Sequence, residues 1–354
     1  MPTFESRGTA VAAVLAGAWR RSPSPLEWPP ASVAAITPLL LKSGSGALGW
    51  WRFRHSDEQL LSTIQPLREM YLQCAIHSAE SERELVEVFR VLRSSGVEPI
   101  LIKGWAIARA YPETGLRPSG DIDLCVSREQ QADAQAVVNT LVNQQHWIDL
   151  DHDEVTRFSE FSFEELYSRS DLVNLDGTVI RVMGAEDHLR ILCLHLLKHG
   201  AWRPLWLCDV AAALESRPAN FDWDRCFGRN KRWADWIACA IGLANRLLGA
   251  KLGDAPIKSK ANRLPNWLVS SVLKQWSASS PPSLPLPLLA NQQVKAIWQK
   301  SGIISAVRQR WPNPVVATVY TNGPFDDTMR LPFQLRNCLA RTVKLCLRLR
   351  ASLR

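Results

Sequence analysis

The sequence lacks a long hydrophobic run, because no stretch of about 18 consecutive apolar residues occurs in it. Nothing in it therefore predicts a transmembrane helix. The closest approach to a signal-peptide core is the segment 9–19, TAVAAVLAGAW. Glu5 and Arg7 precede that segment and cancel in charge, so the basic leader that secretion requires is missing, and we expect a protein that is not secreted.

Paired cysteines are missing as well. The eight cysteines are scattered through apolar stretches, and no two of them form a Cys-x-x-Cys pair. This distribution argues against a disulfide framework and against the usual zinc-finger spacing. It favours small core residues in the reducing environment of the cytoplasm.

Acidic residues are scarce near the C-terminus. The chain has a net charge of +8, yet the part from Pro281 onward has eleven Lys or Arg against two Asp, which is +9. The rest of the chain is therefore close to −1. A basic tail on a neutral body is weak support for a polynucleotide in the central region.

What the sequence does contain is a segment of mixed pattern, 96–126, which reads GVEPILIKGWAIARAYPETGLRPSGDIDLCV. The branched apolar run Val97–Ile102, which ends at Lys103-Gly104, predicts a buried β-strand. Residues 105–111 have helical composition, and Pro112 ends them. After a basic loop, a second strand is predicted over 121–126.

The second strand begins with two acids, Asp121 and Asp123. In a strand their spacing sends both carboxylates to one face, while the residues between and after them form an apolar face. Two adjacent carboxylates resist ionisation unless a cation lies between them. Mg²⁺ binds through one or two carboxylates together with substrate phosphates and water. The pattern therefore predicts a Mg²⁺ site at Asp121 and Asp123.

A phosphate site is predicted directly upstream of these acids. The helix that begins after Lys103-Gly104 presents unbonded N–H groups and a partial positive charge to an anion. Lys103 adds a full charge, and Gly104 allows a close approach of the backbone. Arg117, in the loop before the acids, suits bidentate contact with a phosphate.

The order of strand, Lys-Gly, helix, basic loop and Asp-x-Asp strand resembles the nucleotidyltransferase superfamily of DNA polymerase beta type. More narrowly, LIKGWAIARAYPETGLRPSGDIDLCV resembles a family of bacterial nucleotidyltransferases in which a Lys-Gly turn and an Arg-x-x-Gly-Asp-x-Asp segment recur. The resemblance continues through DHLRILCLHLLKHGAWRPLWLCDV and covers roughly residues 30 to 250. One departure is Gly104-Trp105, where the superfamily has a Gly-Ser or Gly-Gly pair that contacts a phosphate.

The resemblance implies an activity and a third acid. The activity is transfer of a nucleoside monophosphate from a nucleoside triphosphate such as ATP to an acceptor hydroxyl, with release of pyrophosphate. The third carboxylate would lie on a strand predicted over 147–150, after a helix at 129–144. Asp149 fits that position best, and Asp151, on the same strand face, is the competing choice, with Asp153 close behind.

We expect an α+β fold, with a small mixed β-sheet nucleotidyltransferase core, a helical N-terminal layer and a helical C-terminal domain. The expected segments are 1–95, 96–184, 185–276, and 277–354, the last being a Pro-rich linker with a basic region. Within the core, Asp176-Gly177 between the runs 172–175 and 178–182 predicts a β-hairpin at the edge of the sheet. The acceptor has no recognisable signature, since a small molecule, a sugar, a protein side chain and an RNA end all suit the same donor chemistry.

Three histidines, His188, His195 and His199, fall on one stripe of the helix that we predict over Glu186–His199. Zinc binding, a stripe that faces the nucleotide and ordinary packing are the alternatives, although no Glu-x-x-His or third-ligand pattern accompanies the histidines. The resemblance covers His195, His199 and Asp209 and implies a role for them near the nucleotide or the acceptor. The tryptophans clustered from Trp202 to Trp236 are expected in the core.

Residues 333–354 predict a basic amphipathic helix, with an arc that includes Arg341 and Lys344 opposite an arc that includes Leu335 and Leu339. Such a helix suits an anionic membrane surface or a protein partner, or else it packs on the body with its basic side in solvent. Two other functions fit the whole chain. One is a catalytically silent scaffold, and the other is a nucleotide-sugar glycosyltransferase that uses Asp-x-Asp, although its long preceding βαβ region is missing here.

Overall fold

The protein is seen in a computed structural model that describes residues 6–142, 147–150, 155, 160–261, 263–278 and 311–352. Its centre is a five-stranded sheet in the order β3-β2-β1-β5-β4. The pairs β2–β3 and β1–β5 are parallel, and the pairs β1–β2 and β4–β5 are antiparallel, so the sheet is mixed as predicted. The strands are β1 (Ile100–Leu101), β2 (Ile122–Cys125), β3 (Ile148–Leu150), β4 (Asp171–Leu175) and β5 (Thr178–Val182).

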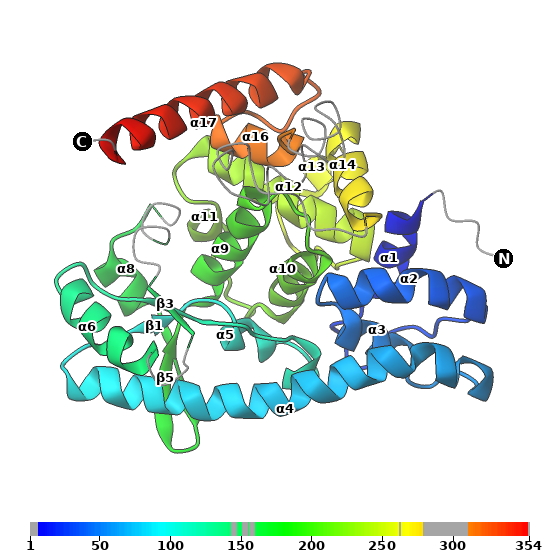
Figure 1. Ribbon diagram of the computed structural model, residues 1–354, viewed down its shortest axis with the longest axis horizontal. Coiled ribbons are helices and arrows are strands. Elements are labelled where there is room, and N and C mark those ends of the chain that lie inside the picture. Colours follow the sequence, from blue (N-terminus) through cyan, green and yellow to red (C-terminus); the bar gives the residue numbers. More distant parts are fainter. Residues whose placement is uncertain are drawn as a thin grey trace.

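Helices make up most of the remainder, so the predicted α+β class is confirmed (Figure 1). They are α1 (Arg7–Leu15), α2 (Pro30–Lys42), α3 (Gly46–Phe53), α4 (Glu58–Ser94), α5 (Trp105–Ala108), the 3₁₀ turn η1 (Thr114–Leu116), α6 (Gln131–Val142), α8 (Phe163–Ser168), α9 (Ala185–Lys198), α10 (Pro204–Ser216), α11 (Trp223–Phe227), α12 (Lys231–Leu248), α13 (Lys258–Ala261), α14 (Asn266–Trp276), α16 (Pro314–Tyr320) and α17 (Leu331–Ser352).

The predicted hairpin is confirmed. Leu175 and Thr178 pair at the end of β4 and the start of β5. Asp176 and Gly177 between them have φ angles of 49° and 75°. Positive φ at both central residues is what a type I′ turn requires, and the twist of that turn matches the twist of the strands.

The first strand is shorter than predicted. Only Ile100 and Leu101 belong to β1, rather than the whole run from Val97. Val97 N–H instead donates to Leu92 O at 3.0 Å and closes the end of α4. Pro99 has no N–H to give to a ladder, so pairing begins only after it.

Each face of the sheet is covered by helices. On one face Leu101, Ile122 and Leu124 pack with apolar residues of α4 and α6. On the other face Ile102 and Cys125 pack with residues of α8 and α9. The alternation along β2 therefore places Asp123 on the side of α9, opposite the apolar face, as predicted.

Helix α4 connects the sheet to the N-terminal helices. It has 37 residues and runs along the lower edge of the molecule in Figure 1. Its first half buries Leu60, Ile64 and Leu67 in one core with α2 and α3, and its second half buries Phe89 and Leu92 against the sheet. The N-terminal layer is thus held to the sheet by a single continuous helix.

The largest hydrophobic core joins both ends of the described chain. Val11, Val14 and Leu15 of α1 lie in one cluster with residues of α9, α10, α12 and α14. Gly8 allows the closest approach, because an added Cβ would lie 1.9 Å from Leu273 O of α14. Gly8 N–H also donates to Ser277 Oγ at 2.7 Å. The first helix is therefore an integral part of the helical body.

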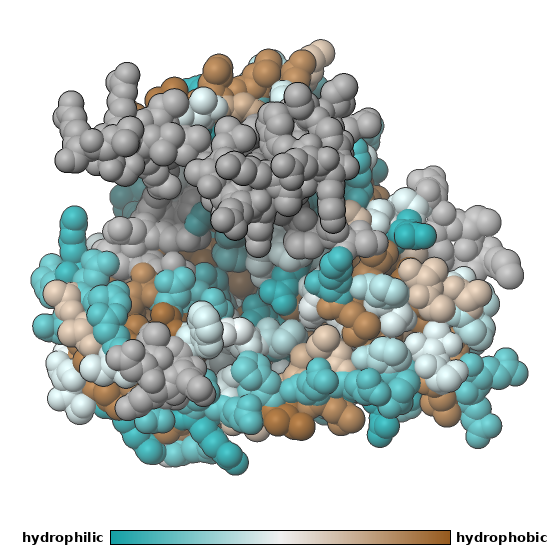
Figure 2. All heavy atoms as spheres, in the orientation of Figure 1, coloured by the Kyte–Doolittle hydropathy of each residue, from teal (hydrophilic) through white to brown (hydrophobic). Residues whose placement is uncertain are grey.

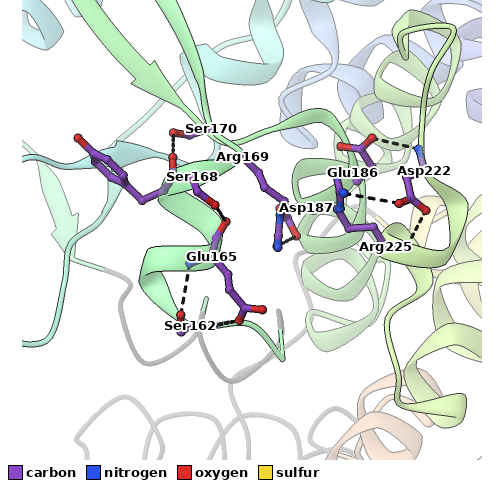
Figure 3. Close-up of polar contacts among 10 residues, drawn as sticks. Ser162, Glu165, Ser168, Arg169, Ser170, Glu186, Asp187, Asp222 and Arg225 are labelled. Carbon is purple, nitrogen blue, oxygen red and sulfur yellow. Dashed lines mark hydrogen bonds and ion pairs between the residues drawn. The ribbon is translucent and has the colours of Figure 1, made fainter.

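A set of polar contacts ties α8 and the sheet to the helical body (Figure 3). At the start of α8, Glu165 N–H donates to Ser162 Oγ at 3.3 Å and Ser162 N–H donates to Glu165 Oε2 at 2.8 Å, a reciprocal capping box. Just after α8, Arg169 donates to both carboxylate oxygens of Asp187 in α9, at 2.9 and 3.0 Å. The preceding residue, Glu186, accepts a hydrogen bond from the backbone N–H of Asp222 at the start of α11.

Two findings bear on membranes and cysteines. Within the described ranges, no helix combines the length and the apolar character needed to cross a membrane. Seven cysteines have described side chains, and six of them are buried with no disulfide recorded among them. The prediction that they are small buried residues is confirmed for these six, while Cys338 on α17 is half-buried.

Candidate functional site

A pocket of about 160 Å³ gathers five of the predicted site residues, Lys103, Arg117, Asp121, Asp123 and His195. They come from the turn before α5, the loop that leads into β2, β2 itself and α9. The other lining residues are Pro118, Gly120, Leu192, Arg203, Trp206 and Asp209. Segments that are about a hundred residues apart in the chain therefore meet at the start of β2.

The two acids differ in burial. Asp123 lies inside β2 and is buried, and Asp121 lies in the bend ahead of the strand and is exposed. Both line the pocket. The fold thus presents one carboxylate at the floor and one at the rim.

Lys103 is paired with the buried acid. Its Nζ lies 2.9 Å from Asp123 Oδ1, and both side chains are about nine-tenths buried. A cation is needed beside a buried carboxylate, and the lysine supplies that charge here. A metal at Asp123, or a phosphate at Lys103, would have to exchange with this ion pair.

Gly104 is required by the backbone around it. Its φ is +57°, and an added Cβ would lie 2.7 Å from Ser119 Oγ and 3.3 Å from Asp121 O. Ser119 Oγ in turn donates to Asp121 O at 3.2 Å. The glycine therefore lets the Lys-Gly turn touch the loop that carries the acids, and its contact with a phosphate stays a prediction.

Trp105, which stands where the superfamily has serine or glycine, is a core residue. It is buried against the sheet, and its Nε1 donates to Glu82 Oε1 of α4 at 2.9 Å. The indole satisfies its polar atom on the side of α4. It is not one of the residues that line the pocket.

Arg117 is held by a carboxylate from the helical body. Its Nε and Nη2 donate to the two oxygens of Asp209 in α10, at 3.2 and 2.9 Å. Tyr111 Oη donates to the same Asp209 at 2.8 Å, and burial raises the pKa of Tyr111 well above its ordinary value. Nη1 donates to Pro118 O at 3.3 Å. Arg117 thus clamps the acid loop to α10, and its predicted phosphate contact would compete with this clamp.

The histidine stripe divides into separate environments. His195 lines the pocket, and its ring centroid lies 4.5 Å from that of His199 and 4.8 Å from that of Trp206. Burial lowers the pKa of His195 well below its ordinary value, and the charge of Lys103 lowers it further. His195 is therefore a neutral imidazole at pH 7.

His188 lies deeper. Burial lowers its pKa to about 4, and it is not among the residues that line the pocket. His199 packs beside Trp206, with the ring centroids 5.2 Å apart, and also stays outside the lining. Across the described ranges, no three or more His, Cys, Asp or Glu side chains form a group that could hold a metal ion, which gives the zinc alternative no support.

Asp149 lies on the neighbouring strand at the level of Asp123. In the parallel pairing of β2 and β3, Asp123 and Asp149 are register partners, so both side chains point to the same face of the sheet. Asp149 is exposed and does not line the pocket. Asp151 and Asp153 lie outside the described residues, so the choice of third acid stays a prediction.

Sequence reasoning missed Arg203 and placed Trp206 in the core. Both line the pocket, and Arg203 Nε donates to Ser43 O at 3.0 Å. Neither belongs to a recognisable motif. Their only signal is the position of Arg203-Pro-Leu-Trp206 directly after the histidine helix.

A second cavity of about 570 Å³ lies near the N-terminus, lined by the Pro-rich segment from Pro23 to Pro30 and by residues around Arg52. Arg52 donates there to the backbone oxygens of Val14 and Ser24, at 2.9 and 2.5 Å. It holds the Pro-rich segment in place. None of the predicted site residues lines this cavity.

The pocket suits magnesium better than zinc. Its carboxylates, Asp121, Asp123 and Asp209, are hard oxygen donors, and both oxygens of Asp209 are bound by Arg117. Among the described residues, no group of three or more His, Cys, Asp or Glu side chains could form a closed tetrahedral site. Mg²⁺ needs only one or two carboxylates when phosphates and water complete its shell. The donor set of Asp121 and Asp123 therefore fits a magnesium ion that arrives with a phosphate ligand.

Comparison with protein families matches residues 53–141 and 139–249 to the family described as uncharacterised nucleotidyltransferase. Together the two segments cover more than half of the chain and include every residue that lines the pocket. No curated protein and no solved structure gives a significant match. The protein therefore belongs to this nucleotidyltransferase family.

Proposed function

We propose that the protein transfers a nucleoside monophosphate from a nucleoside triphosphate to an acceptor hydroxyl, with release of pyrophosphate, and that it depends on Mg²⁺. The observation that carries the proposal is the shared pocket, in which Asp121 and Asp123 face Lys103 and Arg203. Carboxylates that suit a metal and cations that suit phosphate lie within one small space. That combination matches the general activity of the family.

Asp121 and Asp123 are the residues that would hold Mg²⁺, with Asp149 as the proposed third acid. When bound, the metal neutralises phosphate charge and lowers the pKa of the attacking hydroxyl. Asp123 is buried beside Lys103, so its charge is already compensated before the donor arrives.

Lys103 and Arg203 are the proposed phosphate ligands. Lys103 lies next to Asp123 and lines the pocket, and the flexible stem of a lysine allows its ammonium to reorient toward a phosphate. Arg203 donates to Ser43 O through Nε. The Nη groups are suited to bidentate phosphate contact. Gly104 and Arg117 are proposed to shape the loop, with direct phosphate contact secondary.

His195 is proposed as a binding residue. His195 is poorly suited to act as a general base, because a base must hold the proton that it takes. Burial lowers the pKa of His195 well below the ordinary range. Its neutral ring can still accept or donate one hydrogen bond in the pocket. The ring of His199 packs against the ring of His195, with the centroids 4.5 Å apart.

The test is incubation of the full-length protein with each α-labelled nucleoside triphosphate and Mg²⁺ in cell extract. Label should appear on an acceptor with wild type, and Asp121→Asn and Asp123→Asn should each lose at least about a hundredfold in rate. Asp133→Asn, an exposed acid on α6, is the matched control and should behave as wild type.

The outcomes separate the alternatives. If no triphosphate labels an acceptor and Mg²⁺-dependent nucleotide binding is missing, the protein is a silent scaffold. If label moves only from a nucleotide sugar as a glycosyl group, it is a glycosyltransferase.

Two finer assignments accompany the proposal. We propose that the family belongs to the superfamily of DNA polymerase beta type, which the order of elements around Asp-x-Asp supports. We also propose that the protein works in the reducing cytoplasm, which the buried cysteines support.

A further inference from the structure

Helix α17 presents a row of large aliphatic side chains to solvent. The row consists of Leu331, Leu335, Leu339, Val343 and Leu347, which are between 46% and 68% exposed. Four-residue spacing turns by only about 40° per step, so the side chains form one continuous stripe. Hydrophobic residues gather along the upper edge of the molecule in Figure 2, where Figure 1 places α17.

The opposite side of α17 is the side that packs on the body. Asn337 on that side is fully buried. Gln334 Nε2 donates to Pro312 O at 2.7 Å, and the Arg341 guanidinium lies 6.0 Å from the ring centroid of Tyr320. The helix therefore docks through polar side chains and the ring of Phe333, which lies against Gly323, and leaves Leu335 and Leu339 outside. The helix does pack on the body, as one of the alternatives has it, but the leucines lie on its solvent side.

Charge on and around this helix has a single sign. From residue 328 to the end, the sequence has seven Lys or Arg and no Asp or Glu. Among the described side chains of α17, Arg336 is an exposed charged neighbour of the row. A second copy of α17 laid against this row would bring like charges together, so charge complementarity favours an anionic counterpart.

The position of α17 favours a flat counterpart. The helix lies at the edge of the molecule and its C-terminal end projects beyond the neighbouring elements (Figure 1). With 22 residues it is about 33 Å long, which gives an extended line of contact. An extended apolar line with basic residues around it is the pattern of helices that lie in a lipid interface.

We propose that α17 lies on a membrane surface that contains anionic lipid, with its aliphatic row at the acyl boundary and Arg336 among the headgroups. This inference does not depend on the proposed transfer reaction, because no residue of α17 lines the pocket. A groove on an acidic protein and a contact between two copies are the competing occupants. The experiment below distinguishes them.

The experiment is cosedimentation of the full-length protein with vesicles. Phosphatidylcholine vesicles with about 30 mol% phosphatidylglycerol should bind the protein, and pure phosphatidylcholine should bind it at least about tenfold more weakly. Raising the salt to about 0.5 M should also weaken binding, because it screens the headgroup charge. No binding to the anionic vesicles at low salt would overturn the proposal.

A matched pair of variants tests the row itself. Leu335→Glu with Leu339→Glu should weaken binding at least about tenfold, since two exposed aliphatic contacts are replaced by charge. The control is Leu72→Glu with Ile76→Glu, which has the same spacing on α4 and exposures of 44% and 64%, and it should bind as wild type. All four positions are exposed, so both proteins should keep the wild-type melting temperature.

Two results would reject the lipid assignment. Equal vesicle binding by the α17 variant and wild type would show that another surface makes the contact. A wild-type dimer in solution that the α17 variant alone dissociates, without a change in vesicle binding, would assign the row to a second copy.

Discussion

Single residues set the shape of the pocket, and Gly104 is the clearest case. Gly104→Ala should lose at least about tenfold in transfer rate, because the methyl group pushes the loop that carries Asp121 away from the Lys-Gly turn. Gly96→Ala is the control. It has a similar positive φ of +78°, but an added Cβ there meets nothing within 4 Å. It should cost about 1 kcal/mol of stability and leave the rate unchanged. Equal rates for both variants would contradict this account.

His188 should make the stability of the protein depend on pH. Its pKa is lowered from 6.5 to about 4, so the unfolded chain takes up a proton in that window while the folded chain does not. The contribution of neutral His188 to stability is fully present above pH 6.5. The free energy of unfolding should fall by up to about 3 kcal/mol as the pH drops to 4. Urea titrations at several pH values measure the slope.

His188→Gln should reduce that slope, because the side chain no longer titrates. Part of the slope should survive in the variant, since the pKa of His195 is lowered in the same direction. Identical slopes in the variant and in wild type would show that His188 is not buried in its neutral form.

At the scale of elements, the link between the acid loop and α10 depends on Arg117 and Asp209. Asp209→Ala should destabilise the protein by about 3 to 5 kcal/mol, because it leaves a buried guanidinium without its carboxylate. Adding Arg117→Met should recover most of that loss. Chemical denaturation of the two single variants and the double variant gives the coupling, and additive effects would contradict a direct pair.

Local patterns predicted the elements better than the contacts between them. The hairpin follows from Asp176-Gly177, and the face of Asp123 follows from the alternation along β2, because both depend on adjacent residues. The short β1 could also have been predicted, because Pro99 has no N–H for a strand ladder. The Arg117–Asp209 pair could not be predicted, because 92 residues separate the two. An arginine near Asp-x-Asp also suits a phosphate equally well. Arg203 enters the pocket only through the packing of α10.

For the whole molecule, the family match does not correspond to an independent folding unit. Residues 53–249 share their largest core with α1, α2 and α14, which lie outside the match. A fragment of residues 53–249 should therefore unfold or aggregate, because it exposes the apolar surface that those helices cover. Circular dichroism and gel filtration of the fragment against the full chain provide the measurement. A monomeric fragment with a cooperative melt would show that the flanking helices are dispensable.

The contact between α1 and α14 also has a consequence for how the protein is made. Helix α1 is synthesised before the residues that it packs against near Leu273 and Ser277, which follow about 260 residues later. At ordinary rates of translation that interval is on the order of 10 s or more. During it α2 and α3 can cover part of α1, but the side of α1 around Gly8 lacks the surface that α14 supplies, which makes this short helix a natural point of engagement for a chaperone on the nascent chain.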